Sequence, residues 1–324
     1  MLIKLNFKRK NDKILRETKN NFKNMAEIKK KKKTLGMGLG GGGARGLAHI
    51  GMLEVLEENG IKPDYIAGTS MGAVIAGMYA VGYPIKKMKE IAMNFRSIQI
   101  IPQQYLNLLH ESVLKADFII DAFTQLFDGK TFEDCILPFY TIAVDLESGK
   151  EVMFNKGPIG KAILASVSIP IIFPPTFHDE MYLIDGGILE NVPLRGIREI
   201  YKPDILIGSK IVNYTSRQYI SGMVYAKYQQ QKYQSLFKKA NFIQEFVNKT
   251  KKDLHLLVGI ALRAMDIAGG HNTDARIKAA NPDFLLEPNI QCGLLEFDKA
   301  EVAMEEGRKS MLAVLPQLKE MLKS

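Results

Sequence analysis

A serine flanked by glycines is the first candidate for chemistry in this sequence. Ser70 lies in Gly68-Thr69-Ser70-Met71-Gly72, between a short apolar segment and a run of small residues. A nucleophile elbow needs a small residue two before and two after the serine, because the turn from strand to helix leaves no room for a Cβ. At the start of the helix the free amides, including that of Met71, favour a developing negative charge. The pattern predicts that Ser70 is a nucleophile.

An acid that could activate this serine stands at the end of another apolar segment. Asp185 follows residues 181–184, and Gly186 and Gly187 leave room around its carboxylate. Taken alone, Asp-Gly-Gly is also a common turn. Taken with Ser70, it predicts a serine–aspartate dyad in which partial desolvation raises the proton affinity of the carboxylate.

The histidines offer a different base. His49 lies among apolar neighbours on a predicted helix, which favours a packing role over a catalytic one. His255 and His271 follow the serine and the aspartate in the chain order of conventional Ser-Asp-His hydrolases, so that class remains an alternative. The other two histidines lie in no recognisable constellation: His110 and His178.

A glycine-rich loop precedes the serine. Residues 40–46 read Gly-Gly-Gly-Gly-Ala-Arg-Gly, between a predicted strand at 34–39 and a predicted helix at 47–58. They also match the spacing of dinucleotide sites, but the acid that would bind a ribose is missing at the end of the next predicted strand. We therefore expect bare amides to hold an oxyanion, namely those of Gly41, Gly42, Gly43 and Ala44. Arg45 either positions this loop or meets a phosphate.

Charge is unevenly distributed along the 324 residues, of which 46% are hydrophobic. Residues 1–33 carry a formal charge of +10, whereas the remainder carries −1. This tail is either a solvated extension or a segment attracted to anionic lipid. It ends in a run of five lysines: Lys29, Lys30, Lys31, Lys32 and Lys33. No secretory signal or membrane-spanning stretch is expected, and two distant cysteines favour a reduced, cytoplasmic setting.

Predicted strands alternate with predicted helices along the chain, which indicates an α/β fold. The expected strands are residues 34–39, 65–66, 139–146, 181–184 and 205–212, with 151–154 as a hairpin-like partner of 139–146. The expected helices are residues 47–58, 71–81, 84–95, 116–127, 160–167 and 298–323. The helix at 116–127 is either a cap over the active site or an ordinary core helix.

A basic segment interrupts this pattern after the strand at 205–212. Residues 214–254 carry a net charge of +6, five tyrosines and apolar residues at helical spacing. The segment is typical either of a helix lying on an anionic membrane surface or of a solvated helix with one face packed. Nucleic-acid binding is not expected, because no recognisable module accompanies the charges.

Together these motifs resemble those of the patatin-like phospholipases, closest to the bacterial members related to the neuropathy target esterase catalytic domain. The resemblance covers residues 34–212 and 258–322. It is carried by the glycine loop at 40–51, the serine motif at 68–73, the segment Ala-Ser-Val-Ser-Ile-Pro-Ile-Ile-Phe-Pro-Pro at 165–175 and Asp-Gly-Gly at 185–187. Four motifs in order are more specific than any one of them.

The resemblance implies a three-layer α/β/α fold with a mostly parallel central sheet, spanning residues 34–324 with a basic insertion at about 213–255. It implies hydrolysis of lipid acyl esters, such as phospholipids, by Ser70 and Asp185 without a metal or cofactor. A lipid transacylase on the same dyad and a non-catalytic membrane-docking adaptor remain alternatives. We expect a cytoplasmic protein, peripheral at the inner membrane surface if the basic segments bind lipid, and the sequence does not indicate its oligomeric state.

Overall fold

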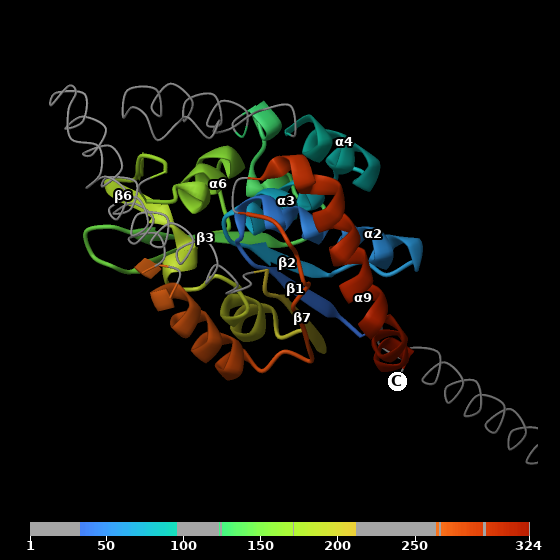
Figure 1. The fold of residues 1–324 in the computed structure, drawn as a ribbon. Helices are drawn as coiled ribbons and strands as arrows, with labels where there is room; N and C mark the ends of the chain where they lie inside the picture. The colour runs from blue at the N-terminus through green and yellow to red at the C-terminus, as the bar shows by residue number, and fades with distance from the viewer. Residues whose placement is uncertain are drawn as a thin grey trace, which may run out of the picture. The chain divides into compact units, whose positions relative to one another are not determined.

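The computed structural model describes residues 33–95, 123, 125–170, 172–211, 264–265, 267–293 and 296–323, and an eight-stranded sheet lies at its centre (Figure 1). The strand order is β5-β6-β3-β2-β1-β7-β8, with β4 paired to β3 as well. Five strands run parallel: β1 (Leu35–Leu39), β2 (Tyr65–Gly68), β3 (Phe139–Asp145), β7 (Ile205–Ser209) and β8 (Phe284–Leu286). These strands are rich in Ile, Leu and Phe, as expected for a sheet covered on both faces.

The remaining strands make antiparallel pairs, and the pairing of β6 with β3 explains how the two predicted catalytic residues meet. Thr141 of β3 pairs with β2 and with β4 (Glu151–Phe154), and Ala143 of β3 pairs with β4 and with β6 (Met181–Asp185). A strand has only two edges, so β2 and β6 lie along the same edge of β3. β2 and β6 run toward each other. Their last residues, Gly68 and Asp185, pair with Thr141 and Ala143 of β3, which are two positions apart.

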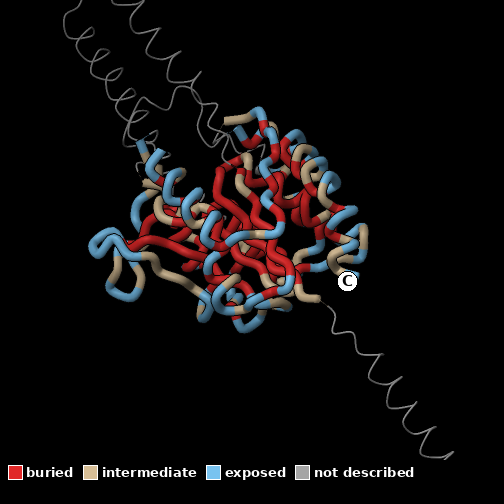
Figure 2. The backbone as a smooth tube through the Cα atoms, turned by 90° about the horizontal axis from the view of Figure 1, so that it is seen from below, coloured by how far each residue is buried: buried red, intermediate tan, exposed pale blue. Residues whose placement is uncertain are grey.

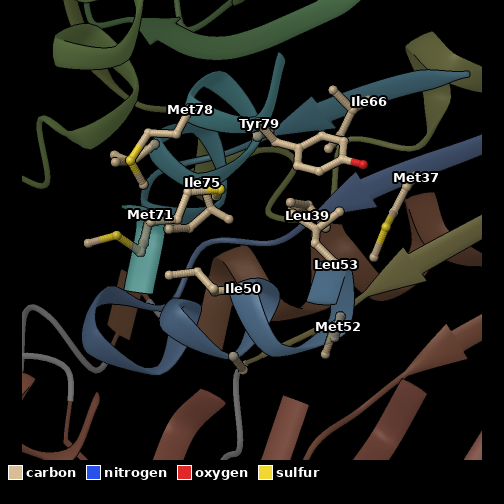
Figure 3. Packing of buried hydrophobic residues seen from close by; sticks show 14 of the residues in the cluster. Met37, Leu39, Ile50, Met52, Leu53, Ile66, Met71, Ile75, Met78 and Tyr79 are labelled. Atoms are coloured by element: carbon tan, nitrogen blue, oxygen red, sulfur yellow. The ribbon is translucent and has the colours of Figure 1, made fainter. Parts of the chain in front are cut away.

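One face of the sheet is covered by long helices, which form the larger part of the core (Figure 1). They are α2 (Ala48–Glu58), α3 (Met71–Ala80), α4 (Ile85–Phe95), α6 (Ile159–Val167) and α9 (Ala300–Lys323). The side chains of α2 and α3 pack on β1 and β2, and Ile50 and Ile75 belong to one core cluster with Leu39 and Ile66 (Figure 3). Most of the buried residues lie in the strands of the sheet and in the helices packed on it (Figure 2).

The opposite face is covered by the turn Ile197–Tyr201 and by a helix at residues 267–280. Strand side chains alternate between the two faces, as the pleat requires. Phe139 of β3 belongs to the larger core, whereas its neighbour Tyr140 packs on the second face with Leu194 and Ile277. The protein therefore has the expected three-layer α/β/α fold with a mostly parallel sheet.

Most expected elements are confirmed within two or three residues, with a few additions. The helix expected at 47–58 is preceded by a 3₁₀ turn, Gly43–Leu47, and a short strand β5 (Thr176–His178), absent from the expectation, pairs with β6. Of the helix expected at 116–127 only Phe123 and residues 125–127 are described; Phe123 and Phe127 are buried in the larger core.

The basic tail, apart from Lys33, and the insertion at 213–255 lie outside the described residues, so both remain predictions. Among the described residues, no helix is both long and apolar enough to cross a bilayer.

Candidate active site

The turn between β2 and α3 places Ser70 in a backbone conformation that few non-glycine residues adopt. Its φ is 55° and its ψ is −127°, a strained combination typical of functional positions. A Cβ at Gly68 would collide with the carbonyl oxygen of Gly72, and one at Gly72 would collide with that of Leu39. The two glycines are therefore required by the close approach of β2, α3 and β1, as the motif predicts.

Asp185 ends β6 directly opposite this turn. Asp185 is only 6% exposed, its carboxylate accepts a hydrogen bond from the Gly187 amide at 2.7 Å, and it lines the same pocket as Ser70. Burial raises the pKa of Asp185 from 3.8 to about 6, while the Ser70 side chain and the Gly187 amide oppose the shift. The arrangement joins a serine hydroxyl to a carboxylate that has a raised proton affinity.

The glycine loop runs beside the serine. A Cβ at Gly41 would lie 2.8 Å from the Cβ of Ser70, so the backbone can approach only without a side chain. The Gly41 amide donates to the side-chain oxygen of Asn191 at 2.6 Å and to its carbonyl at 3.2 Å. Because that N–H already has acceptors, Gly41 is less available as an oxyanion donor than the amides that follow it, and its role in the oxyanion hole remains a prediction.

The next two amides of the loop remain candidates for an oxyanion hole. Within the described part of the chain, the N–H groups of Gly42 and Gly43 have no hydrogen-bond partner. Gly43 has a φ of 57°, in the left-handed region that favours glycine. Both residues line the pocket above Ser70, whereas Ala44 and Met71 do not. The Met71 amide nevertheless begins α3 directly after the serine.

His49 forms a hydrogen bond with the first residue of the glycine loop. It is fully buried, its Nε2 lies 2.8 Å from the carbonyl oxygen of Gly40, and its Nδ1 lies 3.2 Å from the hydroxyl oxygen of Ser209. Burial lowers the pKa of His49 to about 4, so the ring is neutral and donates to Gly40 from Nε2. The packing role favoured from the sequence agrees with this environment.

The alternative histidine bases find no support in the described residues. His271 is exposed on the helix at 267–280 and does not line the pocket with Ser70. His255 lies outside the described residues.

The segment after the Asp-Gly-Gly turn, which the sequence motifs do not mark, contacts both the serine turn and the glycine loop. Glu190 and Asn191 follow the Asp-Gly-Gly turn; the carbonyl of Glu190 accepts from the Thr69 hydroxyl at 3.1 Å, and Asn191 accepts from the Gly41 amide. The Asn191 amide donates to the hydroxyl of Thr273, on the helix at 267–280, at 3.1 Å. Polar residues with no motif around them gave no signal for these contacts.

An ionic cluster around the buried Glu190 fixes the same segment. Arg276 binds the carboxylate of Glu190 at 2.7 Å and also contacts Glu151. Arg195 binds Glu151 at 2.5 Å, and its backbone amide donates to Glu190 at 3.1 Å. Because Glu190 is 2% exposed, leaving its charge without these partners would be costly. The cluster thus ties the loop after Asp185 to β4 and to the helix at 267–280.

A pocket of about 120 Å³ opens over the serine and the aspartate. Its walls are partly apolar, from Ile169, Pro170, Ile188 and Met265, and partly polar, from Arg45, Asn191, Lys210 and Thr273. Arg45 donates from Nε to the Gly42 carbonyl at 3.3 Å, so it both supports the glycine loop and faces the pocket.

Residues 38–197 match the family model described as patatin-like phospholipase, which confirms over these residues the resemblance that the motifs indicate. More particularly, the chain is similar to an uncharacterised NTE family protein of Mycobacterium tuberculosis, with 39% identity over 166 residues covering 50% of this chain and 44% of that protein. It is also similar to Lysophospholipase NTE1 of Candida albicans, with 29% identity over 201 residues covering 60% of this chain and 14% of that protein.

Among solved structures, VipD from Legionella pneumophila aligns with a TM-score of 0.43 and 14% identity, covering 88% of this chain and 67% of that one. The matched part of the chain spans less than half of the length of the mycobacterial relatives.

Proposed function

We propose that this chain is a serine hydrolase of lipid acyl esters that uses Ser70 and Asp185 as a catalytic dyad. The observation that carries the proposal is that Ser70 and the buried carboxylate of Asp185 line one pocket together with Gly42 and Gly43, with the Ser70 side chain near enough to lower the pKa of Asp185. A nucleophile, a base with a raised pKa and unused amides on one side of a pocket are the components that acyl transfer requires.

In the proposed reaction, Asp185 takes the proton of Ser70 as the serine oxygen attacks the ester carbonyl. The negative charge that develops on the carbonyl oxygen is held by the amides of Gly42 and Gly43, with that of Met71 at the start of α3. When this tetrahedral intermediate collapses, the ester C–O bond breaks, and the proton on Asp185 passes to the departing alcohol. Water then attacks the acyl-enzyme, gives its proton to Asp185, and releases the fatty acid as Ser70 regains its proton.

The size and lining of the pocket favour a long substrate bound by its ester. A volume of about 120 Å³ is below the 300–1,000 Å³ of sites that enclose a drug-sized ligand. We infer that the ester and its nearest carbons enter the pocket, whereas most of the lipid remains outside it. The apolar residues Ile169, Pro170, Ile188 and Met265 suit acyl carbons, and Arg45 suits a phosphate.

The name of the Candida relative, a lysophospholipase, supports a phospholipid as the class of substrate. A transacylase would use the same dyad with a lipid alcohol in place of water. Docking to an anionic membrane through Lys29–Lys33 and residues 214–254 remains a prediction, as does a cytoplasmic location.

The proposal is tested by turnover of two substrates. Release of p-nitrophenol from a p-nitrophenyl ester and of fatty acid from phospholipid and lysophospholipid vesicles would be measured for the wild type, Ser70→Ala and Asp185→Asn. Loss of both activities in both folded variants supports the dyad, and product analysis with added lipid alcohol separates hydrolysis from transacylation. A wild type that turns over neither substrate would favour the adaptor alternative.

The pH dependence of turnover should follow the ionisation of Asp185. The base must be deprotonated to accept the serine proton, and its pKa is about 6. We expect kcat/KM on a p-nitrophenyl ester to rise about tenfold per pH unit below 6 and to level off above it. His271→Ala serves as a control and should keep the same profile, whereas a profile that this substitution abolishes would indicate a histidine base.

A further inference from the structure

The C-terminal end of α6 contacts both residues of the proposed dyad. The backbone amide of Ser70 donates to the hydroxyl oxygen of Ser166 at 2.9 Å, and the amide of Asp185 donates to the carbonyl oxygen of Ser168 at 3.0 Å. These serines belong to the motif at 165–175, which contains neither residue of the proposed dyad. One contact depends on a side chain, whereas the other depends only on the backbone.

The Ser70 amide has few other possible acceptors. β2 ends at Gly68 and α3 begins at Met71, so this amide belongs to neither element. In the described part of the chain, Ser166 supplies its acceptor, and Ser166 is fully buried. The bond holds a residue whose φ of 55° is unfavourable for any side chain.

We propose that Ser166 is a positioning residue that fixes the backbone of Ser70, so that the serine hydroxyl remains directed at Asp185 and at the bound ester. The inference rests on the proposed function of Ser70 as nucleophile. Without the acceptor, the strained turn would relax, and the hydroxyl would move relative to the base and to the amides of Gly42 and Gly43. Displacements of about 1 Å in such sites lower the rate by about 100-fold.

Ser168 provides a matched control in the same segment. It is also buried, with 4% of its surface exposed. Its hydroxyl donates to the carbonyl oxygen of Leu164 at 2.8 Å and lies 3.0 Å from the hydroxyl oxygen of Thr176, away from the dyad. Its contact with Asp185 uses the main-chain carbonyl, which Ser168→Ala keeps. Replacing either serine with alanine thus removes one buried hydroxyl, but only Ser166→Ala removes a contact with Ser70.

The test compares the wild type, Ser70→Ala, Ser166→Ala, Ser166→Cys and Ser168→Ala. For each, kcat and KM on p-nitrophenyl butyrate, the rate of covalent labelling by a fluorophosphonate, and Tm would be measured. We expect Ser166→Ala to lower kcat and the labelling rate about 10- to 100-fold with KM changed less than about twofold, because reactivity rather than binding is affected. Ser168→Ala should keep kcat within about threefold even where its Tm falls equally.

The outcomes separate this inference from the proposed function. A wild type that resists labelling, or a Ser70→Ala variant that is labelled as fast as wild type, would overturn both. A labelled wild type with Ser166→Ala and Ser168→Ala equally reactive would overturn only the positioning role. If Ser166→Ala does not fold, Ser166→Cys, which has a similar volume and a weak acceptor, carries the test: a large loss of labelling supports the inference and a wild-type rate contradicts it.

Discussion

Asp185→Asn is expected to be nearly inactive and yet more stable than the wild type. As the proposed base, the carboxylate accepts the proton of Ser70, and removal of such a base typically lowers kcat by about 10²- to 10⁴-fold. Asparagine is nearly isosteric and can accept the Gly187 hydrogen bond through its oxygen while its amino group faces Ser70. The loss of activity would therefore reflect the chemistry rather than a change of shape.

The gain in stability follows from the cost of burying this charge. The native pKa of Asp185 is about 6 against an ordinary value of 3.8, so the folded state binds the proton more tightly than the unfolded state. The contribution of Asp185 to stability should fall as pH rises from about 4 to 6, and the difference between its two pKa values corresponds to about 3 kcal/mol at neutral pH. The neutral asparagine avoids this cost, so its free energy of unfolding at pH 7 should be higher by about 1–3 kcal/mol.

Urea denaturation of both proteins at pH 7 and pH 4 measures the effect. The difference in free energy of unfolding should be largest at pH 7 and should shrink at pH 4, where the wild-type carboxyl becomes protonated. An Asp185→Asn variant that is less stable than the wild type at pH 7 would show that the carboxylate is not held at an energetic cost.

Gly72→Ala should disrupt the fold at the serine turn. A methyl group there would collide with the carbonyl oxygen of Leu39, which is backbone of β1 and cannot move without disturbing the sheet. Overpacking against a well-packed backbone costs about 1–3 kcal/mol or more. We expect a marked fall in Tm together with loss of esterase activity, because the turn that presents Ser70 would have to move.

Gly77→Ala, on the same helix α3, is the matched control. The atoms nearest to a Cβ at Gly77 belong to the side chains of Ile163 and Phe127, which can adjust, and alanine is a better helix former than glycine. Its Tm and activity should remain much closer to those of the wild type. Equal effects of the two substitutions would mean that the close approach of α3 to β1 does not limit stability.

The sequence was informative about local patterns within the site. The serine turn depends on glycines at fixed spacing, and the steric collisions at Gly68 and Gly72 explain why that spacing is readable. The position of Asp185 at a strand end was also readable from the apolar residues before it. In each case the physical requirement falls on neighbouring residues of the chain.

What could not be predicted depends on contacts across space. The direction of β6, which runs antiparallel to β3 and meets the end of β2, follows from pairing partners rather than from its own residues. The hydrogen bond that occupies the Gly41 amide is made by Asn191, 150 positions away. The anchoring of Asn191 by Thr273 is likewise a long-range contact, made by a helix that follows the basic insertion.

The most direct test of the central claim is to locate the residue that a fluorophosphonate modifies, by mass spectrometry of the peptides. The account predicts one adduct on Ser70, its absence in Ser70→Ala, and labelling slowed by about 100-fold or more in Asp185→Asn. An adduct on another residue of the wild type, or labelling of Asp185→Asn at the wild-type rate, would contradict the proposed dyad.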